Sequence, residues 1–133
     1  MATMKFSLVV LTLLLAIASS NSSNYDRKFN VSSDKVHDLI VGGRQYGDRI
    51  VHQEYVYKPS KWLGTVTLDK TFNLGYRENI TQVKVLDTKA DGTGAYPRVT
   101  GGGPGNSWVS LHFESQRSHG IKFNVEIYAK TRY

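Results

Sequence analysis

The sequence predicts an all-β fold, an antiparallel β-sandwich or small barrel of about seven strands, preceded by a cleaved signal peptide. Three observations lead to this prediction. Apolar and polar residues alternate with a period of two, which puts one side of an extended strand on a core and the other in water. Turn residues, mostly glycine, separate these runs at fairly regular spacing. The first 20 residues differ in composition from everything that follows.

The segment 1–20 has the layout of a secretory signal peptide. Lys5 precedes an apolar run of 13 residues, from Phe6 to Ala18, and small residues follow. A membrane-spanning helix needs about 20 apolar residues, so this run is too short to be one. We expect cleavage after Ala18 or after Ser20. The mature protein is then secreted and extracellular, with no membrane span.

The mature chain is expected to contain a flexible polar leader, 21–36, and a single β domain, 37–130. The leader has little apolar content, whereas short apolar runs begin at His37. Two sequons of the form Asn-x-Ser/Thr are candidate glycosylation sites in a secreted chain. Asn30 lies in the leader, and Asn79 lies ahead of an alternating run, where we expect a turn.

The alternation predicts strands near 38–42, 49–58, 62–72, 79–88, 95–100, 107–114 and 121–129. The first two are separated by Gly42-Gly43 and Tyr46-Gly47-Asp48. In the third, Trp62, Val66, Leu68 and Phe72 are in phase, and in the fourth Val83 and Val85 are. Valine, isoleucine, tyrosine, phenylalanine and threonine, which suit a pleated surface, are frequent throughout.

The last three strands are the clearest, and we expect them to form a meander. The fifth carries Pro97, which favours an edge strand or a bulge. In the sixth, Val109, Leu111 and Phe113 alternate with polar residues, and the seventh continues this pattern from Ile121. The glycine-rich segment 101–105 between strands is predicted to be a hairpin loop. It lacks the Gly-Lys-Ser/Thr sequence and the helix that a phosphate-binding loop needs.

Composition limits the function. Lysine and arginine number 17 and aspartate and glutamate 11, a net charge of +6, and cysteine is absent. The absence of cysteine excludes disulfides, thiolate metal sites and thiol nucleophiles. Because the basic residues are spread along the chain, we do not expect a nucleic-acid groove. The positive charge favours anionic partners outside the cell, such as acidic glycans.

No motif for catalysis, cofactor binding or metal binding is evident, so the sequence predicts a protein that is not an enzyme. The four histidines lack metal-ligand spacing, and no serine lies in a nucleophile-elbow pattern. A glycan-active enzyme remains an alternative, since sequence does not show how far apart carboxylates lie. Its acids would be Glu114 and Glu126.

Aromatic residues on the polar sides of strands indicate a candidate partner surface. Trp108 and Tyr128 fall on such sides, and Tyr55 and Tyr57 alternate together on one strand. The alternative is that another element of the same fold covers these rings.

The region 38–130 resembles the insect family named for multiprotein bridging factor two. The matching segments are GGRQYGDRIV, ITQVKVLD, the glycine turn before WVSLHFESQR, and GIKFNVEIY. Many secreted members of this family carry the label "probable salivary secreted peptide". The resemblance implies a small domain without catalytic residues or a cofactor.

Two functions follow from this resemblance and the leader. The first is a secreted, salivary or extracellular protein that acts by binding a protein or an acidic glycan. The second is a transcriptional co-activator that links a DNA-bound factor to the basal machinery, the role that the resemblance implies through the family's founding member. The predicted signal peptide favours the first, because an exported chain does not meet nuclear partners.

Overall fold

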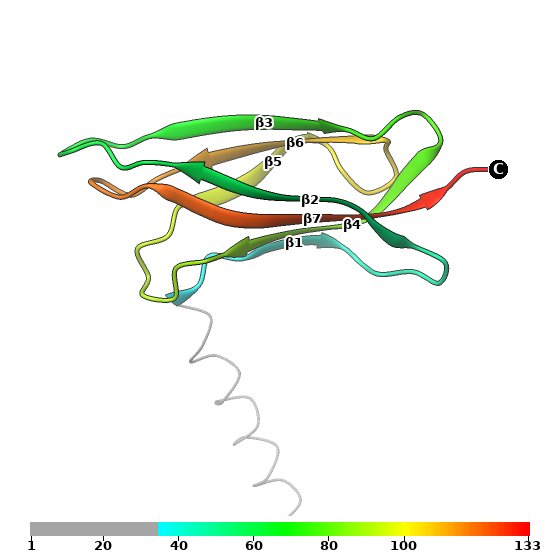
Figure 1. Ribbon diagram of the computed structural model, residues 1–133, viewed down its shortest axis with the longest axis horizontal. Helices are drawn as coiled ribbons and strands as arrows, with labels where there is room; N and C mark the ends of the chain where they lie inside the picture. Colours follow the sequence, from blue (N-terminus) through cyan, green and yellow to red (C-terminus); the bar gives the residue numbers. More distant parts are fainter. Residues whose placement is uncertain (1–34) are drawn as a thin grey trace, which may run out of the picture. The chain divides into compact units, whose positions relative to one another are not determined.

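The computed structural model describes residues 35–133, which form two antiparallel sheets packed face to face (Figure 1). The predictions for the signal peptide, its cleavage after Ala18 or Ser20, most of the polar leader and glycosylation at Asn30 lie outside the described residues. From residue 35 onward, no helix has the length and apolar character to cross a membrane.

The seven strands are β1 (Leu39–Gly42), β2 (Arg49–Lys58), β3 (Thr67–Asn73), β4 (Glu78–Asp87), β5 (Tyr96–Gly102), β6 (Trp108–Glu114) and β7 (Ile121–Thr131). Six of the seven predicted ranges agree with these bounds to within two residues. The all-β prediction is therefore confirmed, and the exception is the start of the third strand.

One sheet has four strands in the order β1-β4-β7-β2, and the other has three in the order β3-β6-β5. All the strand pairs are antiparallel. Because the two sheets pack face to face, the fold is an antiparallel β-sandwich. The predicted C-terminal meander is wrong. β5 pairs with β6, but β7 crosses to the other sheet and lies between β4 and β2. Its alternation would look the same in either sheet, and therefore could not reveal the crossing.

The core lies between the sheets and consists of the apolar residues that alternate along the central strands. β7 contributes a residue at every second position, each fully buried, from Ile121 to Ala129. Phe113 of β6 and Phe123 of β7 meet across the two sheets, with ring centroids 5.3 Å apart. This contact joins the two layers through two fully buried rings.

The third strand starts at Thr67 instead of residue 62, which corrects the prediction for Trp62. Trp62 and Leu63 lie in a turn, 85% and 53% exposed, although the alternation had placed Trp62 in phase with the core. The amide of Gly64 donates to the carbonyl of Lys61, and Leu63 has a φ of 55°, so the chain reverses here. A pattern of apolar spacing does not register such a reversal.

Polar side chains point inward from the two neighbouring edge strands β2 and β3. The Nζ of Lys70 donates to Glu54 at 2.7 Å, and the Nζ of Lys58 donates to the carbonyl of Thr67 at 2.6 Å. These contacts connect the two sheets along one side of the sandwich. Inward-pointing charges on edge strands also discourage pairing with another chain.

Candidate functional site

The four predicted partner-surface aromatics do not form one surface. Tyr55 and Tyr57 lie on β2, about half exposed, with their rings stacked 6.4 Å apart. Tyr128 is on the same face of the four-stranded sheet, opposite Ile50 rather than beside the pair. Trp108 belongs to β6 in the other sheet. Of the four rings, only Tyr55 and Tyr57 therefore lie side by side, and Trp108, 38% exposed, belongs to the other sheet.

The rings of Tyr128 and Trp108 each pack against other residues of the same domain. The guanidinium of Arg44 lies 3.9 Å from the centre of the Tyr128 ring, and the Tyr128 hydroxyl donates to Glu126. That bond to Glu126, with burial, raises the pKa of Tyr128. The Trp108 ring covers Gly101, where an added Cβ would come within 2.8 Å of it. These two rings serve packing within their own sheets.

A hollow of about 200 Å³ lies beside the tyrosine pair, at the end of the sandwich that carries the β2–β3 loop. We call it the lysine pocket. Its lining residues are Tyr57, Lys58, Pro59, Ser60, Lys89, Ser118, His119, Gly120 and Lys122. They come from the end of β2, the start of β7 and the loops that follow β2, β4 and β6. Three loops distant in the sequence therefore build one site.

Close approach of two loops shapes this pocket. A Cβ at Gly120 would lie 2.6 Å from the carbonyl oxygen of Lys58, so the β6–β7 loop can reach β2 only with glycine there. Gly120 is itself buried. The residue after it, Ile121, begins β7 and pairs with Lys58. This pairing places Lys122, the next residue, on the outer face of the sheet opposite Tyr57.

The pocket is positively charged without an internal counter-charge. Among residues 35–133, Lys58, Lys89 and Lys122 line it, and no carboxylate does. The Nζ of Lys58 is directed inward to the neutral carbonyl of Thr67, whereas that of Lys122 lies on the outer face, 6.0 Å from the Tyr57 ring centre. Several cations around one concave site attract an anion more strongly than isolated surface lysines do. The site can thus hold a sulfate, phosphate or carboxylate group.

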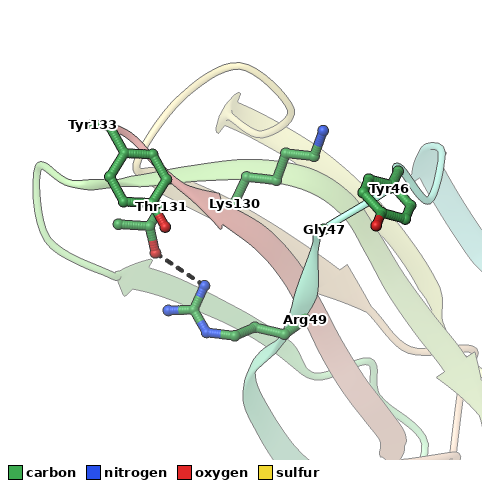
Figure 2. A pocket seen from close by; sticks show the side chains of 6 residues that line it. All are labelled: Tyr46, Gly47, Arg49, Lys130, Thr131 and Tyr133. Atoms are coloured by element: carbon green, nitrogen blue, oxygen red, sulfur yellow. Dashed lines mark hydrogen bonds between the residues drawn. The ribbon is translucent and has the colours of Figure 1, made fainter.

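A larger hollow at the opposite end, of about 670 Å³, is less suited to an anion. Figure 2 shows Tyr46, Arg49, Lys130 and Thr131 among the residues around it. The Arg49 guanidinium donates to Thr131 and pairs with Glu78 at 2.6 Å. Its charge is therefore already balanced, which leaves Lys130 as the free cation of this lining within the described part of the chain.

The acids of the glycan-active alternative are far apart in the fold. Glu114 ends β6, and Glu126 lies on β7 in the other sheet. Neither is among the buried residues, and packed sheets are about 10 Å apart even between their backbones. Paired carboxylates of a glycosidase lie within about 10 Å of each other and flank one bond. Each side chain points outward from its own sheet, on opposite sides of the sandwich, so the two carboxylates cannot act on the same bond.

One polar pair on the outer face of the three-stranded sheet lines neither hollow described above. His112 Nδ1 and Asp69 Oδ1 are 2.6 Å apart on the three-stranded sheet. Among residues 35–133, no group of three or more histidine, aspartate or glutamate side chains could hold a metal ion.

Asn79 lies within β4 instead of at the predicted turn. Its Oδ1 accepts a hydrogen bond from Arg132, and Thr81 of the same sequon is buried and donates to Asp48. The sequon is therefore part of the folded sheet, on the strand next to β7.

The lysine pocket was missed by the sequence reasoning because its cations are separated by some 30 residues each. The charge looked evenly distributed along the chain. The one available signal was that Lys58, Lys89 and Lys122 each stand at or near a predicted strand end, where loops of a sandwich gather.

Comparison with known proteins assigns the chain to a family. A family model described as "Transcription activator MBF2" matches residues 41–129, from β1 to β7. The chain belongs to the MBF2 family. A relative from the bumblebee Bombus ignitus, named "Probable salivary secreted peptide", is 46% identical over 99 residues, covering 74% of each chain. No solved structure matches this MBF2 protein significantly. The expected family resemblance is confirmed.

Proposed function

We propose that this MBF2-family protein is a secreted insect peptide that binds acidic glycans outside the cell through the lysine pocket. The observation that carries the proposal is the group of three lysines around a hollow to which the described part of the chain contributes no carboxylate. The name of the bumblebee relative and the signal-like sequence of residues 1–20 support secretion.

Binding would use charge and flat aromatic surface together. Sulfate or carboxylate groups of a glycan enter the lysine pocket and receive charge-assisted hydrogen bonds from Lys89 and Lys122. The stacked rings of Tyr55 and Tyr57 lie next to the pocket and offer an open surface for a sugar ring. No catalytic step or cofactor belongs to the proposal, and we expect no turnover of the bound glycan.

The test uses protein secreted by insect cells that express the full sequence, with heparin as the probe and neutral dextran as the control ligand. We expect heparin binding that weakens with salt. Lys89→Gln and Lys122→Gln should each lower the affinity by about tenfold, since each removes a charge-assisted hydrogen bond.

Lys130→Gln is the matched control, because it removes the same charge at the opposite end of the sandwich. Its heparin affinity should stay close to that of the unmodified protein. An equal loss in Lys130→Gln and Lys89→Gln would show that net charge alone is responsible, and the proposal would be wrong. Absence of heparin binding would overturn it as well.

A second candidate function is transcriptional activation, which the description of the matching family model favours. The chain would then work inside the cell, in a form that lacks residues 1–20. Expression of the full sequence and of residues 21–133, both tagged, separates the two functions. Activation of a reporter gene by the shorter form, with the full sequence retained in cells, would favour this candidate. Export of the full sequence without reporter activity would reject it.

A further inference from the structure

The turn between β2 and β3 exposes the most prominent apolar residues of the lysine-pocket end. Trp62 is 85% exposed and Leu63 is 53% exposed, directly after Lys61. We call Lys61, Trp62 and Leu63 the β2–β3 tip. Nothing in residues 35–133 covers the two apolar side chains. Large exposed apolar side chains at one tip of a domain mark a surface for interaction.

The tip is held rigidly by hydrogen bonds to the β6–β7 loop. The Ser118 hydroxyl accepts from the amide of Leu63 at 3.0 Å, and the Arg117 guanidinium donates to the Leu63 carbonyl at 3.1 Å. The amide of Ser118 donates to the carbonyl of Gly64 at 2.8 Å. These bonds clamp two loops together, so the exposed conformation is built into the fold.

Leu63 is in an unfavourable backbone conformation. Its φ is 55°, in the left-handed region that a branched side chain rarely adopts. Backbone strain of this kind persists where the surrounding structure maintains it, and it is concentrated at functional positions. Glycine, present at the next position as Gly64, would fit Leu63's conformation without strain. An apolar leucine here adds exposed surface at a cost in stability.

Basic residues lie in the tip and in the loop that clamps it. The two clamped loops, 59–66 and 115–120, contain Lys61 and Arg117 and no aspartate or glutamate. The lysine pocket continues the positive surface on the side of Ser60 and Ser118. A convex apolar tip with basic residues beside it is complementary to a layer of anionic headgroups over hydrocarbon.

We propose that the β2–β3 tip inserts into the surface of a bilayer that contains anionic phospholipids. Tryptophan prefers the boundary between headgroups and acyl chains, and basic residues bind anionic headgroups. A bilayer yields to a convex tip, whereas a protein partner would need a matching pocket. Apolar area and positive charge act together in such interfacial binding. The apolar residues that carry this inference, Trp62 and Leu63, do not line the lysine pocket, which extends the positive surface beside them.

The test uses the secreted protein with vesicles of phosphatidylcholine alone or mixed with phosphatidylserine. We expect cosedimentation with the mixed vesicles that is weakened by salt. The protein has two tryptophans, so Trp108→Phe leaves Trp62 as the fluorescent reporter. Its emission should shift to the blue with the mixed vesicles and stay unchanged with phosphatidylcholine alone. An unchanged emission with both would overturn the inference.

Two variants distinguish insertion of the tip from nonspecific adsorption through exposed aromatic rings. Trp62→Ala should weaken vesicle binding by about tenfold or more. Tyr46→Ala, which removes a fully exposed aromatic ring at the opposite end, should bind as the unmodified protein does. Equal losses in both would contradict the inference.

Leu63→Gly tests the strain directly. It should raise the thermal midpoint of unfolding and still reduce vesicle binding, because it relieves the backbone and removes apolar surface. If it binds vesicles as well as the unmodified protein, insertion by the tip is wrong. Heparin binding distinguishes the two proposals, since its retention without any vesicle binding overturns only the present one.

Discussion

Asp48 shows how a single carboxylate organises the β1–β2 loop. Its side chain is 1% exposed and accepts hydrogen bonds from Arg44, the amide of Gln45 and the hydroxyl of Thr81, each at 2.8 Å. The bond from Arg44 contributes most to holding the pKa of Asp48 well below its ordinary value. The loop and β4 are therefore joined through one ionised group.

Replacement of this carboxylate should produce a pH-dependent loss of stability. Because the folded-state pKa of Asp48 is lowered, its contribution is present above the unfolded pKa, near 4, and is lost as the pH falls toward the folded value. Asp48→Asn should therefore be less stable than the unmodified protein at neutral pH, and the difference should narrow in acid. Urea unfolding across that range measures it. A difference independent of pH would contradict the assigned role.

At the scale of elements, the β6–β7 loop contributes to both candidate binding surfaces. It takes the chain from one sheet to the other, clamps the β2–β3 tip through Arg117 and Ser118, and lines the lysine pocket with His119. Its approach to β2 depends on Gly120. One loop therefore determines both candidate binding surfaces.

Gly120→Ala should separate this loop from β2. The added Cβ would contact the backbone of Lys58, which cannot move as a flexible side chain can. We expect a loss of about 1–3 kcal/mol in the free energy of unfolding, together with weaker heparin binding. Gly47→Ala is a useful comparison. It lies in open space at the opposite end but has a φ of +81°, so its stability should also fall while heparin binding remains.

For the whole molecule, stability depends on packing between the two sheets without disulfides. Phe113 and Phe123 form the contact at the centre of the core. The domain has no cysteine and no cross-link to offset a cavity there. The hydrophobic effect and close packing must carry the fold.

Phe123→Ala should lower the free energy of unfolding by about 3–5 kcal/mol, because it removes a fully buried ring and leaves a cavity. Denaturant unfolding measures this. Tyr76→Ala, which truncates an exposed ring, should change stability by less than about 0.5 kcal/mol. Similar losses in the two variants would show that the core is not where the structure places it.

The local alternation of apolar and polar residues was sufficient to locate the strands, but it did not identify which strands pair with each other. Alternation along β7 identified its buried side because a strand exposes successive residues to opposite faces. It could not show that β7 leaves β6 for the other sheet, because pairing depends on contacts between distant segments. Trp62 was misplaced for a related reason, since the hydrogen bonds that hold its turn against the β6–β7 loop come from residues more than 50 positions away.

The sequence by itself determined the all-β class, the strand boundaries to within a few residues, and the MBF2 family, because these depend on order and spacing along the chain. Only the tertiary structure decided which side chains meet. It brought Lys58, Lys89 and Lys122 around one hollow, separated Trp108 from Tyr55 and Tyr57, and clamped an exposed tryptophan at a loop tip. Binding surfaces arise where loops converge in space, and convergence is a property of the packed sheets.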